Sequence, residues 1–293
     1  MNKEYYLSIL SGHQRGLVAT LFRSFLSFLA FLYSAVLRTR SALYSYGITK
    51  RKTLPAKVIS IGNITTGGTG KTPLVEFLAR YLCTKKKKIA ILSRGYGGLT
   101  PSASECAISA EDGKLKKQKD VNDEYLILRE NLEGIPILLG KDRLYNGEKA
   151  ILNYGSECLI LDDGFQHIKL KRDLDIVVID ALNPFAGGYL IPRGSLREPL
   201  KCLKRADLFI ISHCNQINED RLRALYTKLQ NFNKNVYICE SIHEPVHLEN
   251  ISDNSLQNTS WLRGKKIYGL CAIGNPQSFA ATLKELGVCL IQF

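Results

Sequence analysis

One stretch of this sequence, between positions 59 and 73, carries the residue types that bind nucleoside phosphates. An apolar run leads into a glycine-rich loop, and the loop ends at Lys71 and Thr72, directly before a helical pattern. In a phosphate-binding loop the backbone N–H groups and the helix N-terminus face the anion. The lysine reaches the β- and γ-phosphates, and the threonine hydroxyl binds Mg²⁺. The order of strand, loop, lysine, threonine and helix therefore predicts a nucleoside triphosphate site.

The loop departs from the usual consensus at one position, because Thr65 stands where a first glycine is expected. Gly67 and Gly68 still allow the backbone to close on a phosphate. The alternative, an ordinary glycine-rich turn between a strand and a helix, is disfavoured by the lysine and threonine at the helix start. We expect the nucleotide to be bound by Thr66, Gly67, Gly68, Thr69, Gly70, Lys71 and Thr72.

A second apolar run, residues 158–161, ends in two carboxylates, Asp162 and Asp163. In enzymes with a phosphate-binding loop, a carboxylate at this position holds Mg²⁺ opposite the threonine of the loop. A strand that ends in aspartate is common, so the two carboxylates indicate a metal site only in combination with the phosphate-binding loop.

Beyond residue 55, β-like runs alternate with helical patterns, which predicts a doubly wound α/β fold of the P-loop NTPase type with a mostly parallel sheet. Strands are expected at residues 57–61, 89–93, 135–139, 158–161, 175–179, 208–212, 236–239, 266–272 and 288–292. Helices are expected at residues 73–83, 142–154, 218–231 and 276–286.

We expect three regions along the chain. Residues 1–52 form an N-terminal amphipathic, membrane-associated helical segment, residues 53–205 form the P-loop core, and residues 206–293 form a smaller C-terminal α/β part. The polar, lysine-rich stretch from 99 to 122 is predicted to be a mobile surface loop.

The N-terminal segment holds a net charge of +7 out of the chain's +13, and an apolar run from 16 to 37 lies between its basic residues. Between Arg23 and Arg38 only 14 uncharged residues remain, fewer than the ~20 that cross a bilayer. No small-residue cleavage site of a signal peptide precedes Arg38. We expect a helix lying at a membrane surface and binding anionic lipids; the alternative is an amphipathic helix packed on the protein's own core.

Other binding classes have less support. The eight cysteines contain no C-x-x-C pair, so buried thiols in a reducing cytosol explain them better than disulfides or zinc. The basic charge alone could indicate nucleic-acid binding, but the N-terminal aromatics are spaced as the apolar face of a helix. We therefore expect no nucleic-acid partner, and no obligate protein partner is evident.

Six ordered motifs resemble those of one family, the tetraacyldisaccharide 4′-kinases (lipid A 4′-kinases) of Gram-negative bacteria. They lie at residues 62–73, 93–98, 122–125, 162–167, 191–199 and 272–276. The resemblance runs from the N-terminal helix to the end of the chain. It implies an enzyme at the cytoplasmic face of the inner membrane, with ATP and Mg²⁺ as cofactors. Its reaction in lipid A (lipopolysaccharide) biosynthesis would move the γ-phosphate of ATP to the 4′-hydroxyl of a tetraacylated glucosamine disaccharide 1-phosphate.

The resemblance also implies roles for individual residues. Asp123 would be the base, acting with Lys71 and Asp163 in catalysis, which suits phosphoryl transfer because positioning and charge neutralisation dominate that reaction. The metal contacts would be Thr72, Asp162 and Glu198, and the substrate contacts would be Arg94, Arg197 and Glu124. His167 is expected to be structural.

The chain departs from the family pattern in three places. Arg193 and Ser195 stand where the family usually has Ala and Pro. Asn122 and Tyr125 replace the Gly and Pro of a Gly-Asp-Glu-Pro motif. The chain also ends before an Asp-His-His motif whose histidine is thought to pair with the catalytic aspartate, so it resembles a shortened chain. No obvious replacement is offered by His13, His167, His213, His243 or His247.

Two alternatives follow from these observations. One is a membrane-targeted P-loop ATPase switch, although such proteins carry a signature lysine where this chain has Thr66. The other is an ATP-binding but inactive truncated kinase, which the missing motif favours and the retained loop and aspartates disfavour.

Overall fold

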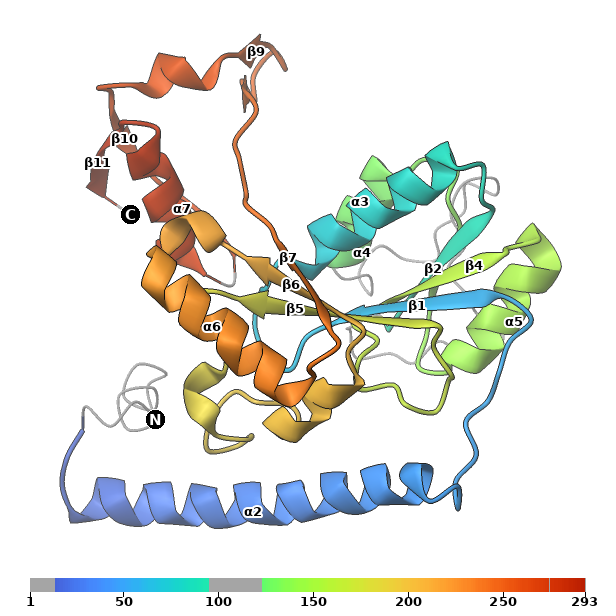
Figure 1. The fold of residues 1–293 in the computed structure, drawn as a ribbon. Helices are drawn as coiled ribbons and strands as arrows, with labels where there is room; N and C mark the ends of the chain where they lie inside the picture. The colour runs from blue at the N-terminus through green and yellow to red at the C-terminus, as the bar shows by residue number, and fades with distance from the viewer. Residues whose placement is uncertain (1–13, 95–122, 274, 293) are drawn as a thin grey trace.

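The structure is a computed structural model, and it describes residues 14–94, 123–273 and 275–292. The loop predicted over residues 99–122 lies outside these ranges. Figure 1 shows a central sheet with helices on both faces and one long helix beneath them.

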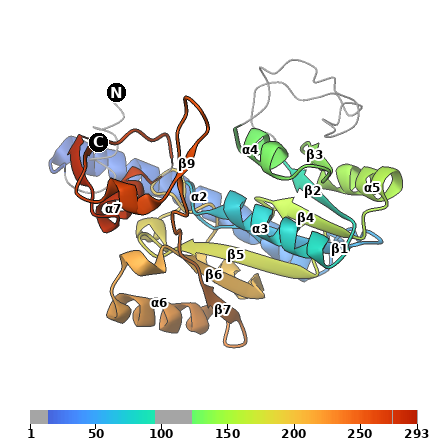
Figure 2. The same ribbon diagram turned by 90° about the horizontal axis from the view of Figure 1, so that it is seen from above.

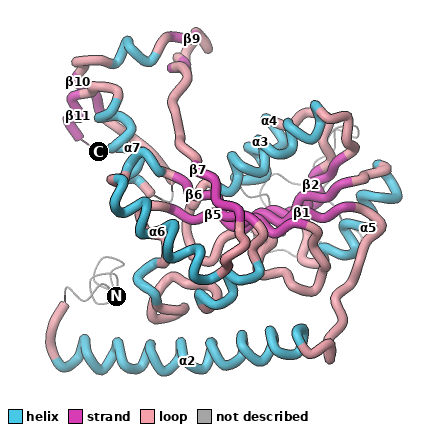
Figure 3. The backbone as a smooth tube through the Cα atoms, viewed as in Figure 1, coloured by secondary structure: helices cyan, strands magenta, loops and turns pink. Residues whose placement is uncertain are grey.

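The central sheet has seven strands in the order β3-β2-β4-β1-β5-β6-β7, and every neighbouring pair is parallel. Figure 3 shows these strands in magenta, crossing the middle of the molecule. The strands are β1 (Lys57–Gly62), β2 (Ile89–Ser93), β3 (Ile137–Leu139), β4 (Cys158–Asp162), β5 (Leu174–Asp180), β6 (Leu208–Ser212) and β7 (Tyr237–Glu240). The predicted doubly wound, parallel α/β fold is confirmed.

Helices cover the two faces of this sheet because alternate strand residues are apolar on both sides. Ile61 packs on one face with Val75 of α3 (Lys71–Thr84) and with α4 (Asp123–Asn131). On the other face, Val58 packs with α5 (Arg143–Tyr154), and Val177 packs with α6 (Glu219–Phe232). Figure 2 shows β1 in the middle of the sheet, with β4 and β5 on its two sides.

The helix α2 (Leu17–Ser45) runs along the underside of the body in Figure 1. One of its faces packs inward through buried Leu26 and Ala30, whereas Phe25 and Phe28 on another face are 57% and 58% exposed. The inner face agrees with a helix packed on the protein's own core, whereas contact of the exposed face with a membrane stays a prediction. Among the described residues α2 is also long and apolar enough to cross a membrane, judged by length and composition alone.

The C-terminal region differs in part from expectation. Strands β6 and β7 belong to the central sheet, so the predicted boundary near residue 205 falls inside that sheet. A separate two-stranded parallel sheet follows, formed by β10 (Lys266–Tyr268) and β11 (Cys289–Gln292) with α7 (Pro276–Glu285) beside it. The strand β10 is shorter than predicted, and its last register pair joins Tyr268 to Gln292.

The remaining short elements were not expected from the sequence. They are the antiparallel pair β8 (Leu248–Glu249) and β9 (Leu256–Gln257), and the 3-10 helices η2 (Ala186–Gly188), η3 (Leu200–Arg205), η4 (Cys214–Gln216) and η5 (Thr259–Leu262).

Candidate active site

The glycine-rich loop connects the central strand β1 to α3, at the carboxyl edge of the sheet, where ligands bind in open α/β folds. A Cβ atom on Gly62 would lie 2.6 Å from the Cβ atom of Phe165, so only glycine allows β1 to pass the turn after β4 this closely. Gly70 has φ 85°, a left-handed conformation, and caps α3, which places Lys71 and Thr72 in the first turn of the helix. This is the geometry of an anion-binding helix N-terminus.

Three hydrogen bonds hold the loop in place. The Asn63 side chain donates to the Thr69 hydroxyl at 3.0 Å, and the Ser212 hydroxyl donates to the Thr69 carbonyl at 3.0 Å. On the other side, the Thr66 amide donates to the Ser195 carbonyl at 2.8 Å. The loop is therefore fixed from β6 and from the segment around residue 195.

The structure brings Lys71, Asp163 and Arg197 together at the start of α3. Arg197 Nη1 lies 2.7 Å from each carboxylate oxygen of Asp163, and Lys71 Nζ lies 3.7 Å from Asp163 Oδ1. Burial by itself would raise the pKa of Asp163, but the charges of Lys71 and Arg197 hold that pKa below its ordinary value. Asp163 is therefore ionised at neutral pH, between two cations that could also contact a phosphate.

Asp162, next to this cluster, is only 2% exposed. Its side chain accepts a hydrogen bond from the Ser93 hydroxyl at 2.9 Å, and Arg143 donates to its backbone carbonyl at 3.0 Å. Burial raises the pKa of Asp162, and the Ser93 hydrogen bond only partly opposes that effect. A cation beside this carboxylate would offset the cost of burying its charge.

These oxygen donors fit Mg²⁺. The described residues contain no group of three or more His, Cys, Asp or Glu side chains that could hold a metal ion by themselves. Mg²⁺ commonly binds through one or two carboxylates, with waters and substrate phosphates completing its octahedron. The buried carboxylate of Asp162 and the Thr72 hydroxyl at the helix start supply that kind of partial ligand set.

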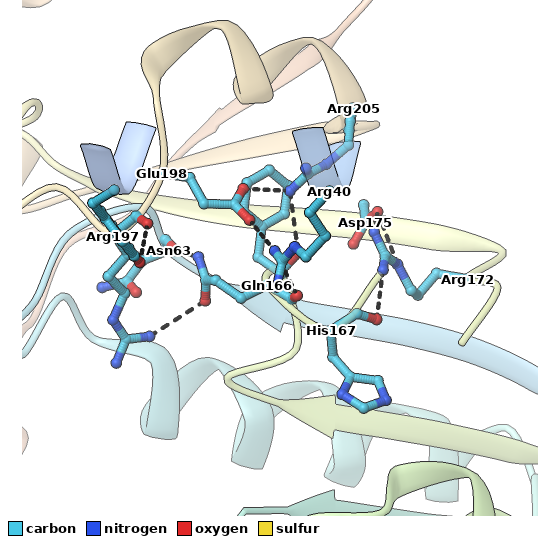
Figure 4. Close-up of polar contacts among 11 residues, drawn as sticks. Arg40, Asn63, Gln166, His167, Arg172, Asp175, Arg197, Glu198 and Arg205 are labelled. Atoms are coloured by element: carbon cyan, nitrogen blue, oxygen red, sulfur yellow. Dashed lines mark hydrogen bonds and ion pairs between the residues drawn. The ribbon is translucent and has the colours of Figure 1, made fainter. Parts of the chain in front are cut away.

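Glu198 is 1% exposed, and each of its carboxylate oxygens is bound by an arginine. Arg40 Nη2 lies 3.0 Å from Oε1, and Arg205 Nη2 lies 2.6 Å from Oε2. Figure 4 shows this carboxylate between the two guanidinium groups, with Gln166 below it. A carboxylate can accept about four hydrogen bonds, so the two arginines fix its orientation and leave further acceptor capacity.

The predicted residues on the other side of the site lie at an edge of the described structure. Arg94 is exposed and directly follows β2. Asp123 and Glu124 are the first two residues of α4, and their side chains lie outside the described part of the chain. Tyr125, which replaces the family's proline, is 1% exposed in the core shared with α3.

Several residues of this site were not predicted from the sequence. Ser93 and Arg143 bind Asp162, and Ser212 binds the loop, although they are separated from these partners by 19 to 143 positions. Only Ser93 had a signal, because it begins a motif that was already noted. His167 has its pKa lowered to about 4 by burial and by nearby arginines, so it is neutral at physiological pH.

A cavity of 480 Å³ opens beside the loop, within the roughly 300–1,000 Å³ of typical ligand pockets. It is lined by loop residues 65–69, by Asp180 at the end of β5 and Asn183 beyond it, and by Asn275 at the start of α7. Near Gly70, His213 binds Asp180 at 3.0 Å, and its ring stacks on the ring of His243. The cavity gives a nucleotide or an acceptor space next to the phosphate-binding loop.

Comparisons with known proteins agree with this geometry. The profile of the tetraacyldisaccharide-1-P 4′-kinases matches residues 22–293. A tetraacyldisaccharide 4′-kinase of Halothermothrix orenii is 36% identical, covering 99% of this chain and 78% of that protein. One of Syntrophus aciditrophicus is 37% identical, covering 87% of this chain and 69% of that protein.

A solved structure gives the same result. The crystal structure of LpxK from Aquifex aeolicus in complex with ATP superposes with a TM-score of 0.67 at 31% identity. The match covers 93% of this chain and 81% of that one. With the profile, the curated relatives and this structure in agreement, the chain belongs to the tetraacyldisaccharide 4′-kinase family.

Proposed function

We propose that this chain transfers the γ-phosphate of ATP to the 4′-hydroxyl of a tetraacylated glucosamine disaccharide 1-phosphate. The observation that carries the proposal is the cluster of Lys71, Asp163 and Arg197 at the end of a phosphate-binding loop. Phosphoryl transfer needs positioned cations around the moving group more than it needs covalent chemistry. The loop and these two cations supply that environment.

Each residue has a role in this proposal. Backbone amides of residues 66–70 bind the phosphates, and Lys71 and Arg197 neutralise charge on the phosphoryl group as it moves. Asp163 keeps the two cations in place through its ion pairs. Asp123 accepts the proton of the acceptor hydroxyl late in the transfer, and Arg94 and Glu124 orient the sugar.

Mg²⁺ would supply positive charge that offsets the charge developing on the transferred phosphoryl group. Thr72 and Asp162 are its proposed protein contacts, and Glu198 is a third. Glu198 already accepts hydrogen bonds from Arg40 and Arg205. To bind the ion as well, its carboxylate would use lone pairs that these two arginines do not occupy.

We place the reaction at the cytoplasmic face of the inner membrane. A substrate with four acyl chains stays in the bilayer, and the exposed apolar face of α2 provides a surface that can enter the lipid boundary. The Tyr33 hydroxyl of α2 donates to the carbonyl of Arg197, a residue whose side chain lies at the phosphate-binding site. The proposed meeting point of ATP and the membrane-bound acceptor is near this contact.

The test is transfer of labelled phosphate from ATP to a tetraacyldisaccharide 1-phosphate in mixed micelles, using this 293-residue chain. Asp123→Asn should abolish transfer, while Asp220→Asn, an exposed aspartate of α6, should not change it. Absence of transfer by the unaltered chain, with Mg²⁺–ATP binding intact, would refute the proposal and favour an inactive ATP-binding protein.

A further inference from the structure

The helix α2 contacts the segment that carries Arg197 and Glu198 at two points. The Tyr33 hydroxyl donates to the Arg197 carbonyl at 3.0 Å. Arg40, nearly two turns later, donates from Nη2 to Glu198 Oε1 at 3.0 Å and to the Gln166 carbonyl at 3.3 Å. The helix is thus joined both to residues 197–198 and, through Gln166, to the turn after β4.

The same segment forms one wall of the phosphate-binding loop. The Thr66 amide donates to the Ser195 carbonyl at 2.8 Å, and the Arg197 amide donates to the Ile64 carbonyl at 2.7 Å. The Arg197 side chain binds Asp163. Residues 195–198 therefore contact α2, the phosphate-binding loop and Asp163.

Glu198 is the point where these contacts converge, as Figure 4 shows. Its side chain is 2% exposed, that of Arg205 is 15% exposed, and that of Arg40 is 40% exposed. A buried carboxylate needs its cationic partners, because it cannot recover the lost hydration elsewhere. Loss of Arg40 would leave Oε1 without this charge-assisted hydrogen bond, so that of the two arginines only Arg205 would hold the carboxylate.

The opposite side of α2 carries the exposed apolar residues. Leu21, Phe25, Phe28 and Phe31 are 57–66% exposed, whereas Tyr33 and Arg40 lie on the side that faces the protein. An α-helix transmits a displacement along its length because its backbone is continuously hydrogen-bonded. The position of α2 on the protein and the position of residues 195–198 are therefore linked through Tyr33 and Arg40.

We propose that Arg40 is a positioning residue of the phosphate-transfer site. Through Glu198 it holds residues 195–198 against the phosphate-binding loop, keeps Arg197 on Asp163, and ties the N-terminal helix to that arrangement. Its role in turnover rests on the proposed kinase activity, whereas its role in holding the segment does not.

The first test is amide hydrogen exchange in the full chain, comparing Arg40→Gln with Arg38→Gln. Both variants remove one positive charge from α2, but Arg38 is exposed on the outer side of the helix. Arg40→Gln should increase exchange at the amides of Thr66 and Arg197, and Arg38→Gln should leave both unchanged. Equal exchange in the two variants would overturn the proposal.

The second test is the kinetic effect of the same variants. Arg40→Gln should lower kcat about ten- to a hundredfold, as expected when the orientation of a site residue is lost. The KM for ATP should change less than about threefold, because the loop itself remains. Arg40→Lys should restore part of kcat, and both charge-removing variants should bind vesicles of phosphatidylethanolamine and phosphatidylglycerol equally.

Tyr33→Phe covers the case in which Arg40→Gln does not fold. It removes only the hydroxyl that donates to the Arg197 carbonyl and keeps the packed ring. A smaller increase in Arg197 amide exchange is expected, and unchanged exchange would count against the link between α2 and the segment. If the unaltered chain transfers no phosphate, the proposed function fails, while the exchange comparison still decides the role of Arg40.

Discussion

Arg197 binds both carboxylate oxygens of Asp163 from a single nitrogen, Nη1, at 2.7 Å to each oxygen. Lys71 approaches the same carboxylate to 3.7 Å. Asp163 itself has φ 52°, a conformation that is uncommon outside glycine and that turns the chain sharply after β4. This turn directs the carboxylate toward the cations at the end of the phosphate-binding loop.

Lys71 gives the most direct prediction. Lys71→Ala should lower the rate of phosphate transfer about 10²- to 10³-fold, the usual effect of removing one group that stabilises transition-state charge. Steady-state transfer assays with the tetraacylated acceptor measure this change. Lys234→Ala, which removes an exposed lysine after α6, should leave the rate unchanged; equal losses in both variants would contradict the role of Lys71.

Arg197→Lys predicts a change in pH dependence. Lysine keeps the charge but cannot present a planar guanidinium to Asp163. The pKa of Asp163 is now held low by Lys71 and Arg197 against the effect of burial, so the weaker partner should let that pKa rise. The acidic limb of the kcat profile should then move to higher pH.

The pH profile of kcat, measured from about pH 4 to pH 9, checks this shift, since model aspartates titrate near ~3.9. Arg223→Lys changes an exposed arginine that pairs with Glu219 on α6, and it serves as the control. An acidic limb that stays in place in Arg197→Lys would mean that Arg197 does not set the ionisation of Asp163.

Much of the fold could be predicted from the sequence, because the central strands are short apolar runs bounded by polar residues. The strands β2 and β6 begin and end at the predicted residues. The helix α4 was missed, since it has only nine residues and follows a polar stretch without a clear start signal. The helix α4 packs against α3 in a shared core, and this contact could not be predicted from the sequence of α4 alone.

The site was predictable where its residues are neighbours in the sequence, and it was not where the fold joins distant ones. The loop from 66 to 72 and the pair Asp162 and Asp163 are local patterns. The contact of Ser93 with Asp162 spans 69 positions, and that of Arg40 with Glu198 spans 158. No local periodicity encodes such pairs, because they depend on which strands and helices become neighbours in the sheet.

The two sides of α2 predict opposite results for two substitutions. Leu26→Ala should lower the free energy of unfolding by about 2–5 kcal/mol, because Leu26 is 6% exposed and its removal leaves a cavity. Phe28→Ala should change that free energy little, since Phe28 is 58% exposed. It should instead weaken binding to vesicles, because a membrane-inserted ring contributes by its buried apolar area.

Chemical denaturation and vesicle co-sedimentation separate these effects in the full chain. If Phe28→Ala bound vesicles as well as the unaltered chain, the exposed face of α2 would not be the membrane contact.

We expect the buried carboxylate of Asp162 to lower the stability of the protein while serving its activity. Its pKa is raised by burial, so the folded state binds a proton on this carboxyl more readily than the unfolded chain does. The contribution of this group to stability is therefore fully present below its unfolded pKa and is lost as the pH rises through its folded pKa. At neutral pH the ionised carboxylate destabilises the protein unless a cation compensates it.

Asp162→Asn removes that charge with little change of shape. The variant should unfold at a higher temperature than the unaltered chain at pH 8 without Mg²⁺, and the difference should shrink as the pH falls and the native carboxyl takes up its proton. Added Mg²⁺–ATP should raise the melting temperature of the unaltered chain more than that of the variant, because the charge of the ion offsets the buried carboxylate and the asparagine carries no charge to offset. The variant should also lose phosphate transfer, as expected when stability has been given up for a functional charge. A melting temperature that falls in Asp162→Asn at pH 8 would show instead that the carboxylate is stabilised by its hydrogen bond with Ser93 and by the charge of Lys71.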